Sequence, residues 1–370
     1  MSRNLPLFTL ALGLAATGLV AGTPSGHEAG MVFTSTNALV GNELLVYVRA
    51  QDGSLALRHH LATGGLGSNA GLGSQGAVTL SVDGRFVFVV NAQSSTLSTF
   101  ALRGQEPVLT SVVPSGGLHP ISVTEHEGIV YVLNDGADGN VAGFRNIQGR
   151  LHPMAGSVRG LSQAGGTAPA QVGFSEDGET LVVTEKGTNR LTSYDVRGDG
   201  GSISTPKVIP SVAKTPFGFA FNRRNRLLVT EAVGGAPGAS SVSSYRFVPS
   251  SPAQPQVVSA AVPTTQTAAC WIAITPNGRF AYVTNAGSSS VSSYRIQPGG
   301  QIELQEAVAG QTGTGSAPID DAVSADGRHL YVRNAGTLTI TAYAIDSEGN
   351  LEAEATTPGL PKSAVGLAAN

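Results

Sequence analysis

Two glutamates, Glu185 and Glu231, stand out because of the places that they occupy in the sequence. Each directly follows a short apolar run, residues 181–184 and 227–230, and five other runs of this kind end in asparagine. An ionised carboxylate accepts hydrogen bonds and donates none, so each glutamate needs water or a cationic partner such as Lys186. Two carboxylates on one surface could activate water as general bases or bind a cation. A salt-bridged structural role is the alternative for either glutamate.

Other side chains with suitable chemistry lie near similar runs. Arg333 comes just before the polar residue that ends one run, and His119 precedes Pro120. A guanidinium, an imidazole or a lysine such as Lys186 could polarise a carbonyl oxygen during ester or lactone hydrolysis. An ordinary ion pair for Arg333 and a hydrogen-bonded structural role for His119 are the alternatives.

The polar residues that end these runs form a repeat along the chain, and an aromatic residue follows each of them in the next run. The polar residues are Asn37, Asn91, Asn134, Glu185, Glu231, Asn285 and Asn334, and the aromatic residues are Tyr47, Phe100, Phe144, Tyr194, Tyr245, Tyr294 and Tyr343. The intervals average about 50 residues, a period that is typical of a propeller with one blade per repeat. The sequence therefore predicts an all-β fold, a seven-bladed β-propeller with four antiparallel strands in each blade.

The two ends of the chain predict how the ring closes. The first blade begins at residues 31–37, which fit a second strand, so its first strand is missing there. Residues 363–369 are a short apolar segment, and we expect them to pair beside residues 31–37 and close the ring. Residues 31–370 then form a single propeller domain, preceded by a signal peptide at 1–22 and a spacer at 23–30.

Tight turns distinguish the two faces of the predicted disc. The pairs Asp83-Gly84, Asp177-Gly178, Asn277-Gly278 and Asp326-Gly327 suit two-residue hairpins between the first and second strands. Since these strands are antiparallel, the polar residues that end the second strands lie on the opposite face, beside the starts of the first strands. There we expect ligand-binding residues around one mouth of the central channel: Gln75, Gln171, Lys186, Trp271 and Asp320, with His119 nearby.

Composition excludes several classes of function. Charged residues make up 13% of the chain and the formal net charge is −3, so no nucleic-acid partner is expected. The single cysteine, Cys270, excludes an internal disulfide. We find no ligand spacing for a metal ion and no phosphate-binding loop, so no cofactor is expected. The apolar run after Arg3 predicts secretion or export to the periplasm or cell envelope, as a monomer without a membrane span in its mature form.

Two segments resemble a known family. Residues 171–185, which read QVGFSEDGETLVVTE, and residues 272–285, which read IAITPNGRFAYVTN, are similar to the seven-bladed lactonase propellers. That family includes 6-phosphogluconolactonase and the carboxymuconate-lactonising enzyme, and the chain is also similar to its exported members. The resemblance implies a propeller that hydrolyses a lactone. Family members begin one inner strand with Pro-Arg-His, whose Arg and His belong to the site; here Pro169-Ala170-Gln171 replaces it, while the following glutamate is kept as Glu185.

Two functions from different classes remain open. In the first, the protein hydrolyses a small-molecule lactone or ester at the channel mouth, with Glu185 or Glu231 as general base. Arg333, Lys186 or His119 would then polarise the carbonyl oxygen. In the second, the same mouth binds a ligand or an envelope protein without catalysis, because fold alone does not fix function. A cation held by the two glutamates and channel waters is a further interpretation.

Overall fold

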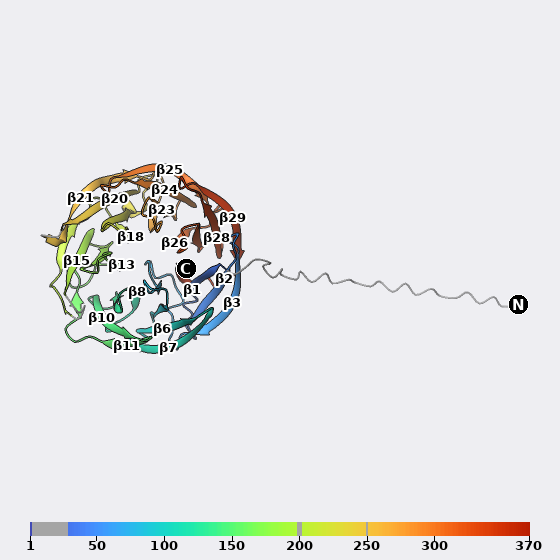
Figure 1. Ribbon diagram of the computed structural model, residues 1–370, viewed down its shortest axis with the longest axis horizontal. Coiled ribbons are helices and arrows are strands. Elements are labelled where there is room, and N and C mark those ends of the chain that lie inside the picture. Colours follow the sequence, from blue (N-terminus) through green and yellow to red (C-terminus); the bar gives the residue numbers. More distant parts are fainter. Residues whose placement is uncertain (2–28, 198–201, 249–250) are drawn as a thin grey trace.

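The computed structural model describes residues 1, 29–197, 202–248 and 251–370. Figure 1 shows a ring of seven sheets around a central axis, with strand β1 (Gly30–Ser35) and the C-terminal end of the chain inside the ring. Each sheet is antiparallel, and its strands follow one another from the axis to the rim. This arrangement confirms the predicted seven-bladed, all-β propeller. The predicted signal peptide and most of the predicted spacer lie outside the described residues.

The innermost strand of each blade lines the axis. In order from blade two to blade seven, and then blade one, these strands are β4 (Val78–Leu80), β8 (Pro120–His126), β13 (Pro169–Phe174), β18 (Pro216–Phe221), β22 (Ala269–Ile274), β26 (Pro318–Val323) and β30 (Val365–Ala369). Four of them begin with proline, which has no N–H group and is therefore tolerated at the first position of a strand.

The second and third strands hold most of the core. The second strands are β1, β5 (Phe86–Asn91), β9 (Ile129–Asn134), β14 (Thr180–Glu185), β19 (Arg226–Glu231), β23 (Phe280–Asn285) and β27 (His329–Asn334). The third strands are β2 (Glu43–Arg49), β6 (Thr96–Arg103), β10 (Asn140–Ile147), β15 (Arg190–Arg197), β20 (Ser241–Val248), β24 (Ser290–Ile296) and β28 (Thr339–Ile345). Because each blade packs against two neighbours, the second strands are buried on both faces, which explains their continuous apolar sequence.

The outer strands form the rim of the disc, where burial alternates along the chain. They are β3 (Leu55–Ala62), β7 (Glu106–Pro114), β11 (Arg150–Pro153) with β12 (Arg159–Gly160), β16 (Ser202–Ile203) with β17 (Lys207–Pro210), β21 (Ser251–Pro263), β25 (Ile302–Gln311) and β29 (Leu351–Pro358). A short 3-10 turn, η1 (Val233–Gly235), follows β19. Within the described ranges, none of the chain forms a helix with the length and apolar character that a membrane crossing requires.

The repeated aromatic residues of the third strands join each blade to the blade before it. Tyr194 donates a hydrogen bond from its hydroxyl to the Gly160 carbonyl (2.8 Å), and Tyr343 donates to the Gln311 carbonyl (2.6 Å). Both acceptors lie in the outer strand of the preceding blade. A buried tyrosine needs a partner for its hydroxyl, and its ring fills space between the two sheets. The aromatic repeat in the sequence therefore marks contacts between blades.

The ring closes as predicted, because β30 becomes the inner strand of blade one. β30 pairs with β1 in antiparallel register, with Val32 opposite Ala369. The Thr34 hydroxyl donates to the Gly366 carbonyl (2.7 Å), and the Asn370 N–H donates to the Met31 carbonyl (3.0 Å). Pairing of the two ends leaves no open edge at the axis of blade one.

Candidate functional site at the channel mouth

The seven polar residues that end, or in blade one follow, the second strands are wholly buried. Asn285 donates from Nδ2 to the hydroxyls of Ser290 (3.2 Å) and Ser292 (2.9 Å), which lie across the hairpin in β24. Asn91 and Asn334 make equivalent bonds to hydroxyls of their own third strands. These asparagines therefore have a structural role inside their blades.

Glu185 occupies this position in blade four, and neutral donors surround its carboxylate. Oε1 accepts from the Ser162 N–H (2.9 Å) and the Thr192 hydroxyl (2.6 Å). Oε2 accepts from the Ser162 hydroxyl (2.5 Å) and the Thr188 hydroxyl (2.7 Å). All four donors are uncharged. An asparagine at this position would offer one acceptor oxygen, whereas the carboxylate offers two, each with two bonds.

Glu231 has the same kind of surroundings in blade five. Its oxygens accept from the hydroxyls of Ser241 (2.6 Å) and Ser243 (2.8 Å) and from the Ala213 N–H (3.0 Å). The expectation that each glutamate needs water or a cationic partner is wrong, because hydroxyl and backbone N–H groups supply the bonds. The geometry favours a structural role for both glutamates over the predicted role as general base.

The starts of the inner strands do come together, around a segment of the chain itself. Residues 66–76, which we call the strap, precede β4 and cross the mouth of the channel. The Ser74 hydroxyl donates to the Ile121 carbonyl (2.7 Å), and the Trp271 Nε1–H donates to the Ser74 carbonyl (3.0 Å). The Gln75 N–H donates to the Ala170 carbonyl (3.1 Å). These partners belong to blades three, six and four, so the strap is anchored on several sides of the axis.

Gln75 reaches across the axis. Its Nε2 group donates to the Ile272 carbonyl (3.1 Å) in blade six and to Asp321 Oδ1 (3.3 Å) in blade seven. The structure therefore brings Gln75 and Trp271 together, as predicted from strand order. Both side chains are occupied in holding the strap.

A repeated turn positions the remaining groups of the mouth. The residue just before the inner strand has a positive φ in five blades although none of the five is glycine: His119, Ala168, Thr215, Ala268 and Ala317. Its carbonyl accepts a bond from the residue that follows the polar repeat, such as Asp135 N–H to His119 or Lys186 N–H to Ala168 (both 3.1 Å). A positive φ at a residue other than glycine raises the free energy of the folded state by about 1–3 kcal/mol, so the surrounding contacts must stabilise this conformation.

Lys186 follows Glu185 and lies against the strap. Its Nζ donates to the carbonyls of Gly73 (2.5 Å) and Pro169 (3.2 Å) and sits 4.5 Å from the centre of the Phe217 ring. Burial disfavours the ammonium form and lowers the pKa of Lys186 to about 8, although Asp135 opposes that shift. Lys186 can therefore act as a cation below that pH and lose its charge above it.

His119 forms a pair with Asp135 at the same mouth. His119 Nδ1 lies 2.5 Å from Asp135 Oδ1, and the two side chains are 37% and 29% exposed, so solvent reaches both. The hydrogen bond to Asp135 raises the pKa of His119 against the effect of burial. Sequence reasoning named His119 but missed Asp135. The available signal was the position of Asp135, which follows Asn134 as Lys186 follows Glu185.

Asp320 and Arg333 lie inside the wall of blade seven, below the mouth. Both are almost wholly buried, and Arg333 donates from Nη2 to the Ile319 carbonyl (3.1 Å). Burial raises the pKa of Asp320 to about 7 and lowers that of Arg333 to about 10, while each charge favours the other. This placement favours mutual charge compensation over the predicted contacts with substrate.

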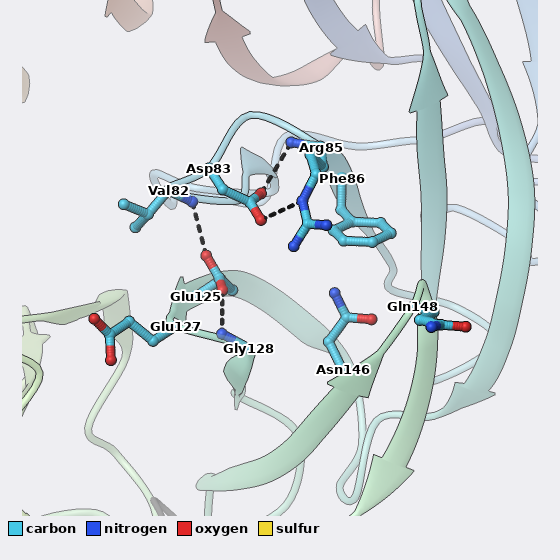
Figure 2. A pocket seen from close by; sticks show the side chains of 9 residues that line it. All are labelled: Val82, Asp83, Arg85, Phe86, Glu125, Glu127, Gly128, Asn146 and Gln148. Carbon is cyan, nitrogen blue, oxygen red and sulfur yellow. Dashed lines mark hydrogen bonds and ion pairs between the residues drawn. The ribbon is translucent and has the colours of Figure 1, made fainter.

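A separate pocket of about 500 Å³ lies on the opposite, hairpin face, between blades two and three. Figure 2 shows its walls, which are formed by Val82, Asp83, Arg85, Phe86, Glu125, Glu127, Gly128, Asn146 and Gln148. We expected the Asp83-Gly84 turn only to form a hairpin and the site to lie on the opposite face, so sequence reasoning missed this pocket. The residues beside this turn carry no signal for it, because Arg85-Phe86 recurs as Arg279-Phe280 in blade six.

Comparison with known proteins agrees with this architecture. The family described as Lactonase, 7-bladed beta-propeller matches residues 126–235 and 239–364. The chain belongs to this lactonase family. No functionally curated protein matches the chain.

Several solved structures share the lactonase fold. The periplasmic gluconolactonase of Pseudomonas aeruginosa is 17% identical over 91% of this chain and 98% of that chain, with a TM-score of 0.68. A candidate 6-phosphogluconolactonase from Bacteroides uniformis is 17% identical over 91% of this chain and 99% of that chain, with a TM-score of 0.70. A protein from Lactobacillus plantarum is 16% identical over 93% and 100%, with a TM-score of 0.72. At these identities the likeness concerns the fold.

This chain departs from the Arg-His pair that the family resemblance implies, because Ala170 and Gln171 stand in its place. The Gln171 Nε2 group donates to the Phe219 carbonyl (2.9 Å), and its Oε1 accepts from the Phe219 N–H (2.7 Å). Gln171 therefore joins the inner strands of blades four and five. With both amide groups engaged, it is not free to replace the catalytic histidine implied by the resemblance.

Proposed function

We propose that the protein hydrolyses a lactone or a related ester at the channel mouth, with His119 as general base and Lys186 as the cationic group. The observation that carries this proposal is the His119–Asp135 pair, held at 2.5 Å on a surface that solvent reaches. His119 Nε2 has no hydrogen-bond partner among the described residues, so it is available to a water molecule. Membership of the lactonase family supports the reaction class.

The proposed chemistry follows from the two groups. Asp135 accepts the Nδ1–H bond, which leaves Nε2 of the neutral imidazole as the acceptor for a proton from water. The resulting hydroxide attacks the carbonyl carbon, and the Lys186 ammonium stabilises the oxyanion. Collapse of the tetrahedral intermediate breaks the ring C–O bond. The leaving alkoxide takes the proton from His119, and the product is a hydroxy acid.

The test is turnover of γ- and δ-lactones and aryl esters by purified protein and variants. We expect His119→Asn, a residue that tolerates the positive φ, to lower kcat/KM by about 100-fold or more, the usual contribution of a general base. Asp135→Asn should lower it as well. His126→Asn, on the hairpin face, is the matched control. An active wild type whose rate is unchanged in His119→Asn would refute the assignment of the base.

A second candidate function is a ligand- or protein-binding propeller of the cell envelope. The occupied mouth favours it, because the strap and Gln171 use groups that a substrate would otherwise contact. Absence of turnover on the whole substrate panel, together with capture of a specific envelope protein by the folded chain, would support this function over hydrolysis.

We further propose that residues 1–22 direct export and are removed, giving a monomer that needs no cofactor and has no nucleic-acid partner. The apolar run after Arg3 supports export. The Pseudomonas aeruginosa structural neighbour is itself periplasmic. N-terminal sequencing and light scattering of the protein recovered from the periplasm would show the cleavage site and the mass. An intact N-terminus in the cytoplasm would contradict the proposal.

A further inference from the structure

We propose that the pocket between blades two and three binds a neutral, polyhydroxylated ligand of the saccharide class. Its volume of about 500 Å³ lies within the range of small-molecule sites. It is on the opposite face from the channel mouth, so this function is independent of the proposed hydrolysis. Two blades form its walls, with Asp83 and Arg85 on one side and Asn146 on the other (Figure 2).

On this face, the junction between blades two and three holds a larger groove than the junction between blades five and six. Side chains cross four other junctions: His126 to the Glu176 carbonyl, Asn225 to Asp177, Arg224 to the Pro298 carbonyl, and Arg49 to Asp326. The related groove between blades five and six has a volume of only about 120 Å³. Between blades two and three, Glu125 crosses at the inner end and accepts from the Val82 N–H (2.8 Å). The outer part of this junction stays open.

The wall of the pocket is fixed before any ligand arrives. Glu125 is 9% exposed, and its second oxygen accepts from the Gly128 N–H (2.6 Å), so both oxygens are in use. Asn146 Oδ1 accepts from the Gly149 N–H (2.8 Å), which orients the amide. Figure 2 shows the Asn146 Nδ2 group directed towards Arg85 and Phe86 across the pocket. A fixed wall lowers the entropy lost on binding.

The lining leaves both donors and acceptors for hydroxyl groups. Arg85 uses Nε for its bond to Asp83 (2.5 Å), which leaves the two Nη groups as donors. Asn146 Nδ2 is a further donor, and the amide oxygen of the exposed Gln148 is an acceptor. A hydroxyl both donates and accepts hydrogen bonds, so a polyhydroxylated ring matches this set.

Other ligand classes fit less well. Three residues with carboxylates, Asp83, Glu125 and Glu127, line the pocket together with one guanidinium, and this excess of negative charge disfavours an anion. Within the described ranges, no group of three or more His, Cys, Asp or Glu residues is placed to hold a metal ion. An apolar ligand would need apolar walls, yet the Phe86 ring is 9% exposed and the Arg85 guanidinium lies 5.6 Å from its centre.

The test is an array of neutral oligosaccharides of glucose, galactose, mannose and N-acetylglucosamine, probed with the folded full chain. Titration by NMR up to about 10 mM would then give the affinity of the bound oligosaccharides. Two variants remove donors: Arg85→Ala, and Asn146→Asp, which keeps the Oδ1 acceptor for Gly149. Arg279→Ala is the matched control, because Arg279 follows the equivalent Asn-Gly turn of blade six and also lies over a phenylalanine.

We expect each donor variant to weaken binding by about 3- to 10-fold, the effect of one lost hydrogen bond. Arg279→Ala should bind as the wild type does. Lactone turnover should be unchanged in all three variants, since none of these residues touches the mouth. The proposal is overturned if no oligosaccharide binds, if the two donor variants bind as tightly as Arg279→Ala, or if inorganic phosphate or Ca²⁺ displaces the bound oligosaccharide.

Discussion

Asp135 acts on two titratable side chains at the channel mouth. Through its hydrogen bond it raises the pKa of His119, and at longer range it opposes the lowering that burial causes in Lys186. In the proposed reaction His119 must be unprotonated and Lys186 must be protonated. His119 therefore limits activity on the acid side of the profile, and Lys186 limits it on the alkaline side.

We expect kcat/KM to rise with pH through the pKa of His119, above its ordinary value of about 6.5, because the base is formed there. It should fall again near the pKa of Lys186, about 8, as the ammonium is lost. Lys186→Arg should remove the falling limb, because a guanidinium stays protonated. Rates between pH 5.5 and 10 provide the measurement, and a falling limb that persists in Lys186→Arg would contradict it.

At this scale the sequence predicted part of the mouth. His119 and Lys186 could be named because their positions in the repeat are visible. The surroundings of Glu185 could not, because Ser162, which supplies two of its four donors, lies in the preceding linker and carries no motif. Many linkers between the blades of this chain contain serine and threonine, so only the structure shows which hydroxyls bind the glutamate.

Among the elements, the ends of the second strands depend on close backbone contact. Glycine stands two residues after the polar repeat in four blades, at Gly136, Gly187, Gly287 and Gly336. A Cβ atom on Gly187 would lie 2.2 Å from the Gly166 carbonyl oxygen, and one on Gly336 would lie 2.0 Å from that of Gly315. A glycine at this position therefore indicates that the end of the second strand packs tightly against the segment that precedes the inner strand.

Gly187→Ala should destabilise the protein by about 1–3 kcal/mol, because the added methyl group meets backbone atoms that cannot move aside freely. Gly160→Ala is the control, since a Cβ atom there would meet nothing within 4 Å. Urea unfolding with an unchanged m value would measure the difference. Equal midpoints for the two variants would show that the contact can relax.

The strap is the element that the sequence did not predict. Residues 66–76 are rich in glycine and serine and have neither strand nor helix period, which indicates a loop and nothing more. Its partners, such as Ile121, Trp271 and Asp321, lie in other blades. Contacts over such distances in sequence leave no local pattern, so the closed mouth could only be seen in the structure.

For the whole molecule, the repeat predicted the number of blades and the closure of the ring, because every blade packs against its two neighbours in the same way. Closure depends on β30, whose Val365 and Leu367 side chains are buried between blades one, two and seven. Ser363 adds a bond from its hydroxyl to the Thr36 carbonyl (2.7 Å). These few residues join the two ends of a ring of seven sheets.

Removal of residues 363–370 should lower the free energy of unfolding by at least about 3–5 kcal/mol, the burial of Val365 and Leu367 alone. Thermal unfolding of the truncated chain would measure this loss. A synthetic peptide of residues 363–370 should restore part of the melting temperature when added in excess. The role of β30 would be contradicted if the truncated chain had the melting temperature of the full chain. It would also be contradicted if the truncated chain folded but its melting temperature did not change when the peptide was added.

The pairing of β30 with β1 also sets an order of events during synthesis. Blade one lacks its axial strand until residues 365–369 have left the ribosome, so six blades can form while the circle is still broken. The nascent protein is then an arc with the backbone of β1 uncovered. Under the export proposed above, a chain that crosses the membrane unfolded would pair β30 with β1 only after its last residues have crossed.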